Sequence, residues 1–146
     1  MIAGNTAAID RAMDLLKASG AKRVVKLNVS APFHCALMLP AQKRLAEDLE
    51  KLEFGDLQMP LVTNVQAVAI RWGSETREAL IQQVSSPVRW QELAEVLIHE
   101  GVDTMVEVGP GKVLSGLMRQ ISRDVECFNV EDSASLEAVR GNFAAS

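Results

Sequence analysis

The feature that most constrains the fold is a regular alternation of strand-type and helix-type segments near the end of the chain. A strand-type run at Asp103–Val108 leads through Gly109-Pro110-Gly111 into a helical pattern at Lys112–Ser122. A second strand-type run at Glu126–Val130 precedes a short helical pattern at Ser133–Val139. Strands separated by helices are typical of βαβ units, in which the strands are parallel. The pattern predicts an α/β fold with a parallel sheet flanked by helices.

The earlier part of the chain is less regular. Asn5 or Thr6 can cap a helix that Gly20 would stop, and a strand is expected after it at Arg23–Val29. Four further segments are expected before residue 101: an amphipathic helix at Leu37–Leu52, a short buried strand at Pro60–Val65, a helix capped by Ser74, and a helix at Trp90–Glu100.

Composition narrows the class of protein. The 146 residues, 48% of them hydrophobic and 23% charged, fit one globular domain, and no linker divides them. A net charge of −4 argues against nucleic acid as the main partner. No apolar run approaches the roughly 20 residues of a membrane span, and no signal-peptide pattern is present. Only two cysteines, Cys35 and Cys127, fit a reducing compartment. A cytoplasmic location without membrane contact is expected.

His34 is the first candidate for chemistry. Pro32 disfavours helix at Ala31, so the expected strand breaks there, and His34 lies between that break and the next helix. A histidine at such a junction is held on both sides and can still reach a cleft, as a general base must. The alternative is a structural histidine satisfied by backbone groups, and from spacing alone this is the more common case.

Three segments resemble one enzyme family. They are V-S-A-P-F-H-C-A-L-M at Val29–Met38, Q-Q-V-S-S-P-V-R-W at Gln82–Trp90 and E-V-G-P-G-K-V-L at Glu107–Leu114. In this order they resemble malonyl-CoA:acyl carrier protein transacylase, an acyltransferase of fatty-acid biosynthesis. The likeness covers only the C-terminal half of such an enzyme. It implies one partial acyltransferase domain over residues 1–146. Residues 1–30 would be the last helix and strand of a ferredoxin-like subdomain, and 31–146 the C-terminal part of an α/β-hydrolase-like subdomain.

The resemblance also implies roles for three residues. His34 falls on the family's catalytic base, and Gln83 on the position whose backbone carbonyl accepts a hydrogen bond from that histidine. Phe33 falls where related acyltransferases line the acyl pocket, and a bulky side chain there fits malonyl better than a branched acyl group. Without the resemblance, Gln83 reads as a polar residue on an exposed helix turn. Ordinary packing explains Phe33 equally well.

The family's nucleophile is a serine in a G-H-S-L-G-type elbow, and no G-x-S-x-G occurs in these 146 residues. The chain is therefore expected to be a fragment that is inactive without an N-terminal half. A non-catalytic α/β remnant or interaction domain remains the alternative.

Other chemistry is not expected. Gly109-Pro110-Gly111 resembles a phosphate loop, but Leu114 replaces the last glycine of G-x-G-x-x-G and Pro110 lacks an amide donor. A tight strand-to-helix turn is the better interpretation. Cys35 is interpreted as a packing residue because neighbours in an extended segment point to opposite sides. Histidine and cysteine spacing indicates no metal site, and no cofactor is expected.

The expected partners are malonyl-CoA and acyl carrier protein. The one basic excess, at Lys17, Lys22, Arg23 and Lys26, is either a solvated face or a docking patch for an acidic carrier protein. The resemblance also leaves room for a separate N-terminal half or for self-association, since strands without neighbours expose their edges.

Overall fold

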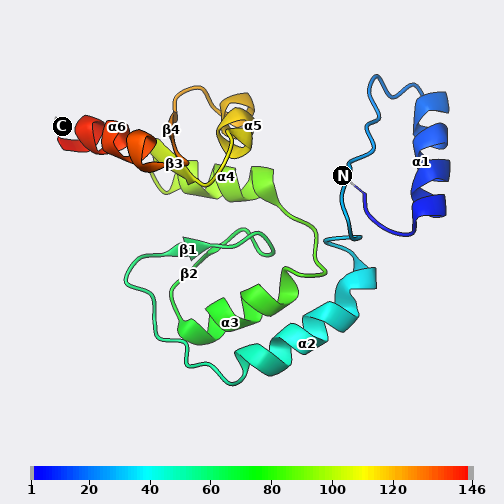
Figure 1. Cartoon of the computed structure of the whole chain (residues 1–146), viewed down its shortest axis with the longest axis horizontal. Helices are drawn as coiled ribbons and strands as arrows, with labels where there is room; N and C mark the ends of the chain where they lie inside the picture. Colours follow the sequence, from blue (N-terminus) through cyan, green and yellow to red (C-terminus); the bar gives the residue numbers. More distant parts are fainter. Residues whose placement is uncertain (1, 145–146) are drawn as a thin grey trace. The chain divides into compact units, whose positions relative to one another are not determined.

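The computed structural model describes residues 2–144. The chain divides into two compact units, Met1–Arg89 and Trp90–Ser146. Figure 1 follows the chain through both, and each unit is described separately below. The expected boundary between subdomains near residue 30 stays a prediction.

The first unit begins with helix α1, Thr6–Ala18. Its N-cap is Asn5, whose side-chain oxygen accepts a hydrogen bond from the Ala7 amide at 3.1 Å. Gly20 ends the helix with a positive φ of 87°, a conformation that costs glycine nothing. The predicted cap and the predicted stop are confirmed. The helix has no buried residue, so local capping is its main support.

The strand expected at Arg23–Val29 is wrong. The described residues 21–30 lie in no strand, although the run has the composition of one. The side chains of Val25, Leu27 and Val29 are each more than half exposed. Strand propensity mainly reflects packing against cross-strand neighbours, and no neighbouring strand pairs with this segment.

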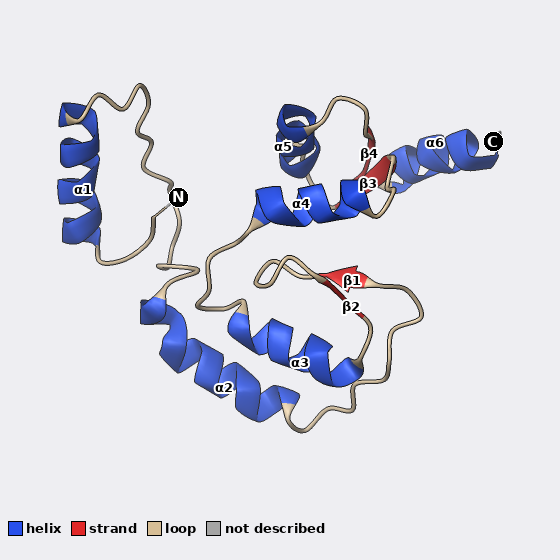
Figure 2. Cartoon of the chain, turned by 180° about the vertical axis from the view of Figure 1, so that it is seen from behind, coloured by secondary structure: helices blue, strands red, loops and turns tan. Residues whose placement is uncertain are grey.

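Two helices make up the framework of the first unit. A short 3₁₀ turn, η1 (Ala36–Met38), runs into α2 (Leu39–Leu49), and α3 spans Gly73–Gln82. Helices α2 and α3 run side by side (Figure 2). The start of α3 lies directly against the loop before β1, since a Cβ added at Gly73 would come 2.0 Å from the Phe54 carbonyl oxygen. The Gly73 amide also donates to Asp56 Oδ1 at 3.1 Å.

The residue expected to cap α3 is different in the structure. Ser74 lies inside the helix, and the N-cap is Trp72. The Trp72 amide donates to Glu75 Oε2 at 3.3 Å, so a side chain in the first turn satisfies the cap backbone. The sequence did not predict this helix start, because Trp72 is large and the usual N-cap residues are small and polar.

The strand expected at Pro60–Val65 is shorter than predicted. Strand β1 covers only Leu61–Val62 and pairs antiparallel with β2, Ala69–Ile70. Ala67, with a φ of 52°, and Ile70 are buried, whereas Leu61 is exposed. The segment is therefore a small hairpin next to α3, and the parallel pairing implied by the βαβ pattern does not extend to it.

The second unit follows the alternation seen in the sequence. Its elements in order are α4 (Trp90–His99), β3 (Thr104–Val108), α5 (Val113–Ile121), β4 (Glu126–Val130) and α6 (Ser133–Ala144). Strands β3 and β4 pair in parallel over five residue pairs, from Thr104 with Glu126 to Val108 with Val130. The predicted α/β class and its parallel sheet are confirmed.

The core of the second unit is small and aliphatic. Ala94 from α4, Met118 from α5 and Val125 before β4 are buried together, and Ile98, Met105, Ile121 and Cys127 pack against them. Helices α4 and α5 and both strands thus meet through a few apolar residues. No helix within residues 2–144 combines the length and the apolar character that crossing a membrane requires.

Candidate functional site

His34 has an unusual backbone conformation. Its φ of 60° lies in the left-handed region, which non-glycine residues rarely adopt and which clusters at functional sites. Two short contacts shape the turn around it. The Phe33 amide donates to the Ala31 carbonyl at 2.9 Å, and Cys35 Sγ donates to the Pro32 carbonyl at 3.1 Å. The chain is thus folded tightly on both sides of the imidazole.

The imidazole of His34 is held by a residue far along the sequence. Nδ1 lies 3.0 Å from the backbone carbonyl oxygen of Gln83, 49 residues away, and His34 is half-buried. A carbonyl oxygen can only accept, so Nδ1 carries the proton in this contact and the Nε2 of a neutral ring is left with its lone pair. A group that can take a proton is therefore oriented by the main chain.

The end of α3 makes this carbonyl available. The helix ends at Gln82 with Gln83 as its C-cap, and the last carbonyls of a helix have no partner within it. The Gln83 amide still donates to the Ala79 carbonyl at 3.0 Å, which fixes the peptide that follows. A histidine ring N–H at this end satisfies a group that would otherwise need water.

A second contact also joins the segment around Gln83 to the helical region that follows His34. The Ser85 hydroxyl donates to Gln42 Oε1, which links the segment after α3 to the middle of α2. Beyond it, the Arg89 amide donates to the Asn64 carbonyl at 2.9 Å, and an Arg89 guanidinium nitrogen donates to the Gln66 carbonyl at 3.0 Å. The chain that carries Gln83 is tied to α2 on one side and to the β1–β2 hairpin on the other.

Phe33 remains open to solvent in this structure. Its side chain is 45% exposed, and Leu37 and Leu39 nearby in sequence are 55% and 51% exposed. Phe33 precedes His34, and Leu37 and Leu39 follow it by three and five residues, so exposed apolar side chains flank His34 in the sequence. The acyl-pocket role of Phe33 stays a prediction, as do the catalytic roles of His34 and Gln83.

The predicted turn at Gly109-Pro110-Gly111 is present, and a side chain occupies the helix start that follows it. Glu107 accepts hydrogen bonds from the Leu114 amide at 3.0 Å, the Ser115 amide at 2.8 Å and the Ser115 hydroxyl at 2.6 Å. The Ser115 hydroxyl, followed by these amides, holds the pKa of Glu107 below its usual range. A carboxylate already fills the position that a phosphate would need.

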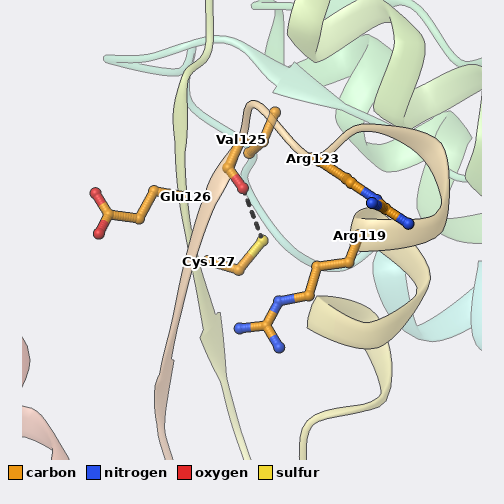
Figure 3. A pocket seen from close by; sticks show the side chains of 5 residues that line it. All are labelled: Arg119, Arg123, Val125, Glu126 and Cys127. Atoms are coloured by element: carbon orange, nitrogen blue, oxygen red, sulfur yellow. Dashed lines mark hydrogen bonds between the residues drawn. The ribbon is translucent and has the colours of Figure 1, made fainter.

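A surface pocket lies in the second unit, whereas His34 and Gln83 belong to the first. Its lining residues are Arg119, Arg123, Val125, Glu126 and Cys127. In Figure 3 Glu126 points away from the two guanidinium groups, and Cys127 Sγ lies 3.7 Å from the Val125 carbonyl oxygen. None of the residues for which the sequence predicted a role lines it.

The two cysteines and two of the four basic residues have local partners. Cys35 and Cys127 are both free thiols. Cys35 is turned to Pro32 by the left-handed backbone at His34, so the extended geometry assumed from the sequence is wrong, although a packing role still fits. Lys26 and Lys17 form ion pairs with Asp10 and Asp14 at 2.5 Å and 3.8 Å. Across residues 2–144, no group of three or more histidine, cysteine or acidic side chains could hold a metal ion.

Sequence reasoning missed four residues of these networks. Gln42 and Ser85 lie 43 residues apart, and nothing local pairs them. Glu107 and Asn129 were visible only as positions in strands. Their signal was a polar residue one position before the end of each strand. Glu107 bonds to the helix start after the turn, and Asn129 Nδ2 donates to the Gly111 carbonyl at 2.6 Å.

Comparison with known proteins connects these segments to one family. No family model matches the chain. The malonyl CoA-acyl carrier protein transacylase of Haemophilus influenzae is 46% identical over 139 residues, which is 95% of this chain and 45% of the relative. Its counterpart from Bacillus subtilis is 41% identical over 137 residues, covering 94% and 43%.

Solved structures agree with the sequence comparison. An acyl carrier protein S-malonyltransferase from Vibrio cholerae is 47% identical with a TM-score of 0.86, over 93% of this chain and 44% of that one. A malonyl-transacylase in complex with its type II acyl-carrier protein is 44% identical with a TM-score of 0.88, over 95% and 45%. The chain spans about half the length of the curated relatives it matches. In sequence and in fold, it belongs to the malonyl CoA-acyl carrier protein transacylase family and corresponds to its C-terminal half.

Proposed function

We propose that this chain supplies the general base of a malonyl transfer from coenzyme A to an acyl carrier protein. The observation that supports this most directly is the 3.0 Å contact between His34 Nδ1 and the Gln83 carbonyl oxygen. It leaves the opposite ring nitrogen as a base without needing a carboxylate partner. The substrates are those that the names of the relatives give.

In this mechanism Nε2 of His34 takes the proton from a serine hydroxyl as the serine attacks the malonyl thioester. The imidazolium then returns the proton to the departing coenzyme A thiolate. The malonyl group is then an ester of the serine. In the second transfer the carrier's phosphopantetheine thiol gives its proton to Nε2 and attacks this ester, and the imidazolium returns the proton to the departing serine oxygen. Throughout both transfers the Gln83 carbonyl keeps accepting from Nδ1, so the ring stays oriented whether it is neutral or charged.

The serine nucleophile in this proposal lies outside the 146 residues. No G-x-S-x-G is found in them, and His34 is the residue that a nucleophile elbow would have to approach. Phe33 would border the acyl group, and its bulk would leave little room for an α-methyl substituent. The absence of an elbow also favours a second candidate, a domain that keeps this fold without catalysis.

The two candidates differ in a direct experiment. The sequence is joined after the N-terminal part of the Haemophilus influenzae relative, and malonyl transfer to an acyl carrier protein is measured. We expect transfer by the chimera, and none by the 146 residues alone when incubated with radiolabelled malonyl-CoA. A folded chimera without transfer would support the non-catalytic domain. Stable labelling of the chain alone, at Ser30 or Ser85 for example, would contradict the assignment of the nucleophile.

Variants of the chimera then separate side chain from main chain. Loss of a general base costs about 10²–10⁴-fold, so His34→Ala should slow transfer by that factor. Gln83→Ala keeps the carbonyl and should cost less than about tenfold, or ~1.4 kcal/mol of transition-state stabilisation. Gln83→Pro removes the amide that donates to Ala79, so it should resemble the histidine loss.

The control for the histidine variant is the second histidine of the chain. His99 is exposed at the end of α4, and His99→Ala should leave transfer unchanged. If Gln83→Ala were as damaging as His34→Ala in a folded chimera, the amide side chain would be the partner and the main-chain assignment would fail.

A further inference from the structure

The carbonyl that orients His34 depends on a second hydrogen bond of the same chain segment. The Gln83 amide donates to the Ala79 carbonyl on α3 at 3.0 Å, and two residues later the Ser85 hydroxyl donates to Gln42 Oε1 on α2. Between the two lies only Val84. A displacement of Ser85 from Gln42 would therefore be transmitted through two peptide units to the Gln83 oxygen.

The backbone bonds that join this turn to α3 are uneven in length. The Gln83 and Ser86 amides donate to Ala79 and Gln82 at 3.0 Å and 3.1 Å, but the bonds between them are longer: Val84 and Ser85 donate to Ile81 and Gln82 at 3.4 Å each. Hydrogen bonds of that length are near the outer limit for N–H···O contacts. The side-chain bond between Ser85 and Gln42, both half-buried, links this turn to a second helix, α2.

Helix α2 is connected to His34 along the chain as well. It follows η1 directly, and η1 begins two residues after His34, with the Met38 amide donating to the Cys35 carbonyl at 2.9 Å. One end of the imidazole contact is thus continuous with α2, and the other is fastened to α2 through Gln42.

We propose that Gln42 and Ser85 are a positioning pair, which holds the Gln83 carbonyl opposite His34 Nδ1 and so selects the ring tautomer with a free Nε2. The pair touches neither substrate nor reacting atoms and acts only through Gln83. Its catalytic consequence rests on the proposed function, whereas its effect on the tautomer does not.

The 146-residue chain allows a direct test by NMR of the imidazole nitrogens. It has two histidines, so His99→Gln leaves His34 as a single ring. In the alkaline range, where imidazoles are neutral, we expect the Nδ1–H tautomer to dominate. Ser85→Ala should lower the ratio of Nδ1–H to Nε2–H by about fivefold, the factor that corresponds to one ordinary hydrogen bond.

Conservative and distant substitutions separate positioning from general loss of structure. Ser85→Thr keeps the hydroxyl and should restore the tautomer ratio. Ser74→Ala removes an exposed serine from the other end of α3 and should leave it unchanged. Should Ser85→Ala fail to fold, Gln42→Met on α2 removes the same hydrogen bond, because it keeps the length of the side chain and lacks the acceptor.

Each outcome decides the proposal. A change of less than about twofold in the ratio, in a folded variant with or without reduced stability, would overturn it. A shift that Ser85→Thr reverses would support it. Failure of the proposed function looks different: His34→Ala would then leave transfer by the chimera intact, whatever Ser85 does to the ring.

Discussion

The chain contains two junctions where an expected strand meets a helix, and they are held in opposite ways. The first junction, residues 29–36, carries His34, and the second, residues 108–113, joins β3 to α5. At the second junction the supporting side chains are nearer in sequence, with Asn129 lying 18 residues from its partner Gly111. Glu107 bonds to Leu114 and Ser115, seven and eight residues on. At the first, His34 is bonded to a residue 49 positions away.

The segments that precede the two junctions differ in strand pairing. Strand β3 is paired with β4 along its length, so the start of the second turn is fixed by the sheet. The segment before His34 pairs with no strand and exposes Val25, Leu27 and Val29. Local residues thus mark where the chain turns, whereas the imidazole at the first turn is oriented by a hydrogen bond to a distant helix end.

The largest effect is expected from moving α3, which supports the first junction from a distance. In Gly73→Ala the new Cβ would meet the Phe54 carbonyl oxygen at 2.0 Å, a backbone atom that cannot turn aside. Helix α3 must shift, at a cost of about 3 kcal/mol in the free energy of unfolding. Hydrogen exchange should show faster opening of α3 amides and a loosened His34 contact.

Gly116→Ala in α5 is the matched control. Its Cβ would meet nothing within 4 Å, so the substitution should stabilise the second unit by roughly 0.8–1 kcal/mol through helix propensity. Equal exchange in Gly73→Ala and the wild-type chain would mean that α3 does not depend on close contact with Phe54, and the distant support of the first junction would need another explanation.

These contacts explain which elements could be predicted from the sequence and which could not. Helices were predicted well because their signals are local: Asn5 caps α1, Gly20 stops it, and apolar spacing marks α5. The strand at Arg23–Val29 failed because a strand needs a neighbour, which a run of suitable residues cannot supply. The bond between His34 and Gln83 was expected only from the family resemblance, since spacing along the chain contains no trace of it.

A medium effect is expected at the second junction from Asn129 on β4. Its Nδ2 donates to the Gly111 carbonyl at 2.6 Å, and lies 3.4 Å and 3.5 Å from the carbonyl oxygens of Glu107 and Gly109. Asn129→Ala removes the donor that joins both ends of the turn. We expect a loss of about 1 kcal/mol, measured by thermal unfolding. Gln91→Ala, on the exposed side of α4, should change it by no more than about 0.5 kcal/mol. An unchanged melting temperature in Asn129→Ala would show that the backbone alone maintains the turn.

The smallest effect is expected from the charge of Glu107, which titrates without disturbing the fold. Its pKa is lowered, first by the Ser115 hydroxyl, so the unfolded chain binds the proton more readily than the folded one. The stabilisation is complete above the ordinary glutamate pKa of about 4.3 and is lost as pH falls through the lower folded value. Melting temperatures of wild type and Glu107→Gln should therefore differ at neutral pH and converge in acid, while Asp132, whose pKa is also lowered, titrates equally in both. Ser115→Ala should give an intermediate pH dependence, because it removes the largest cause of the shift and keeps the carboxylate. A difference that stays constant with pH would assign the effect to the shape of the side chain. The charge of Glu107 would then not stabilise the second junction.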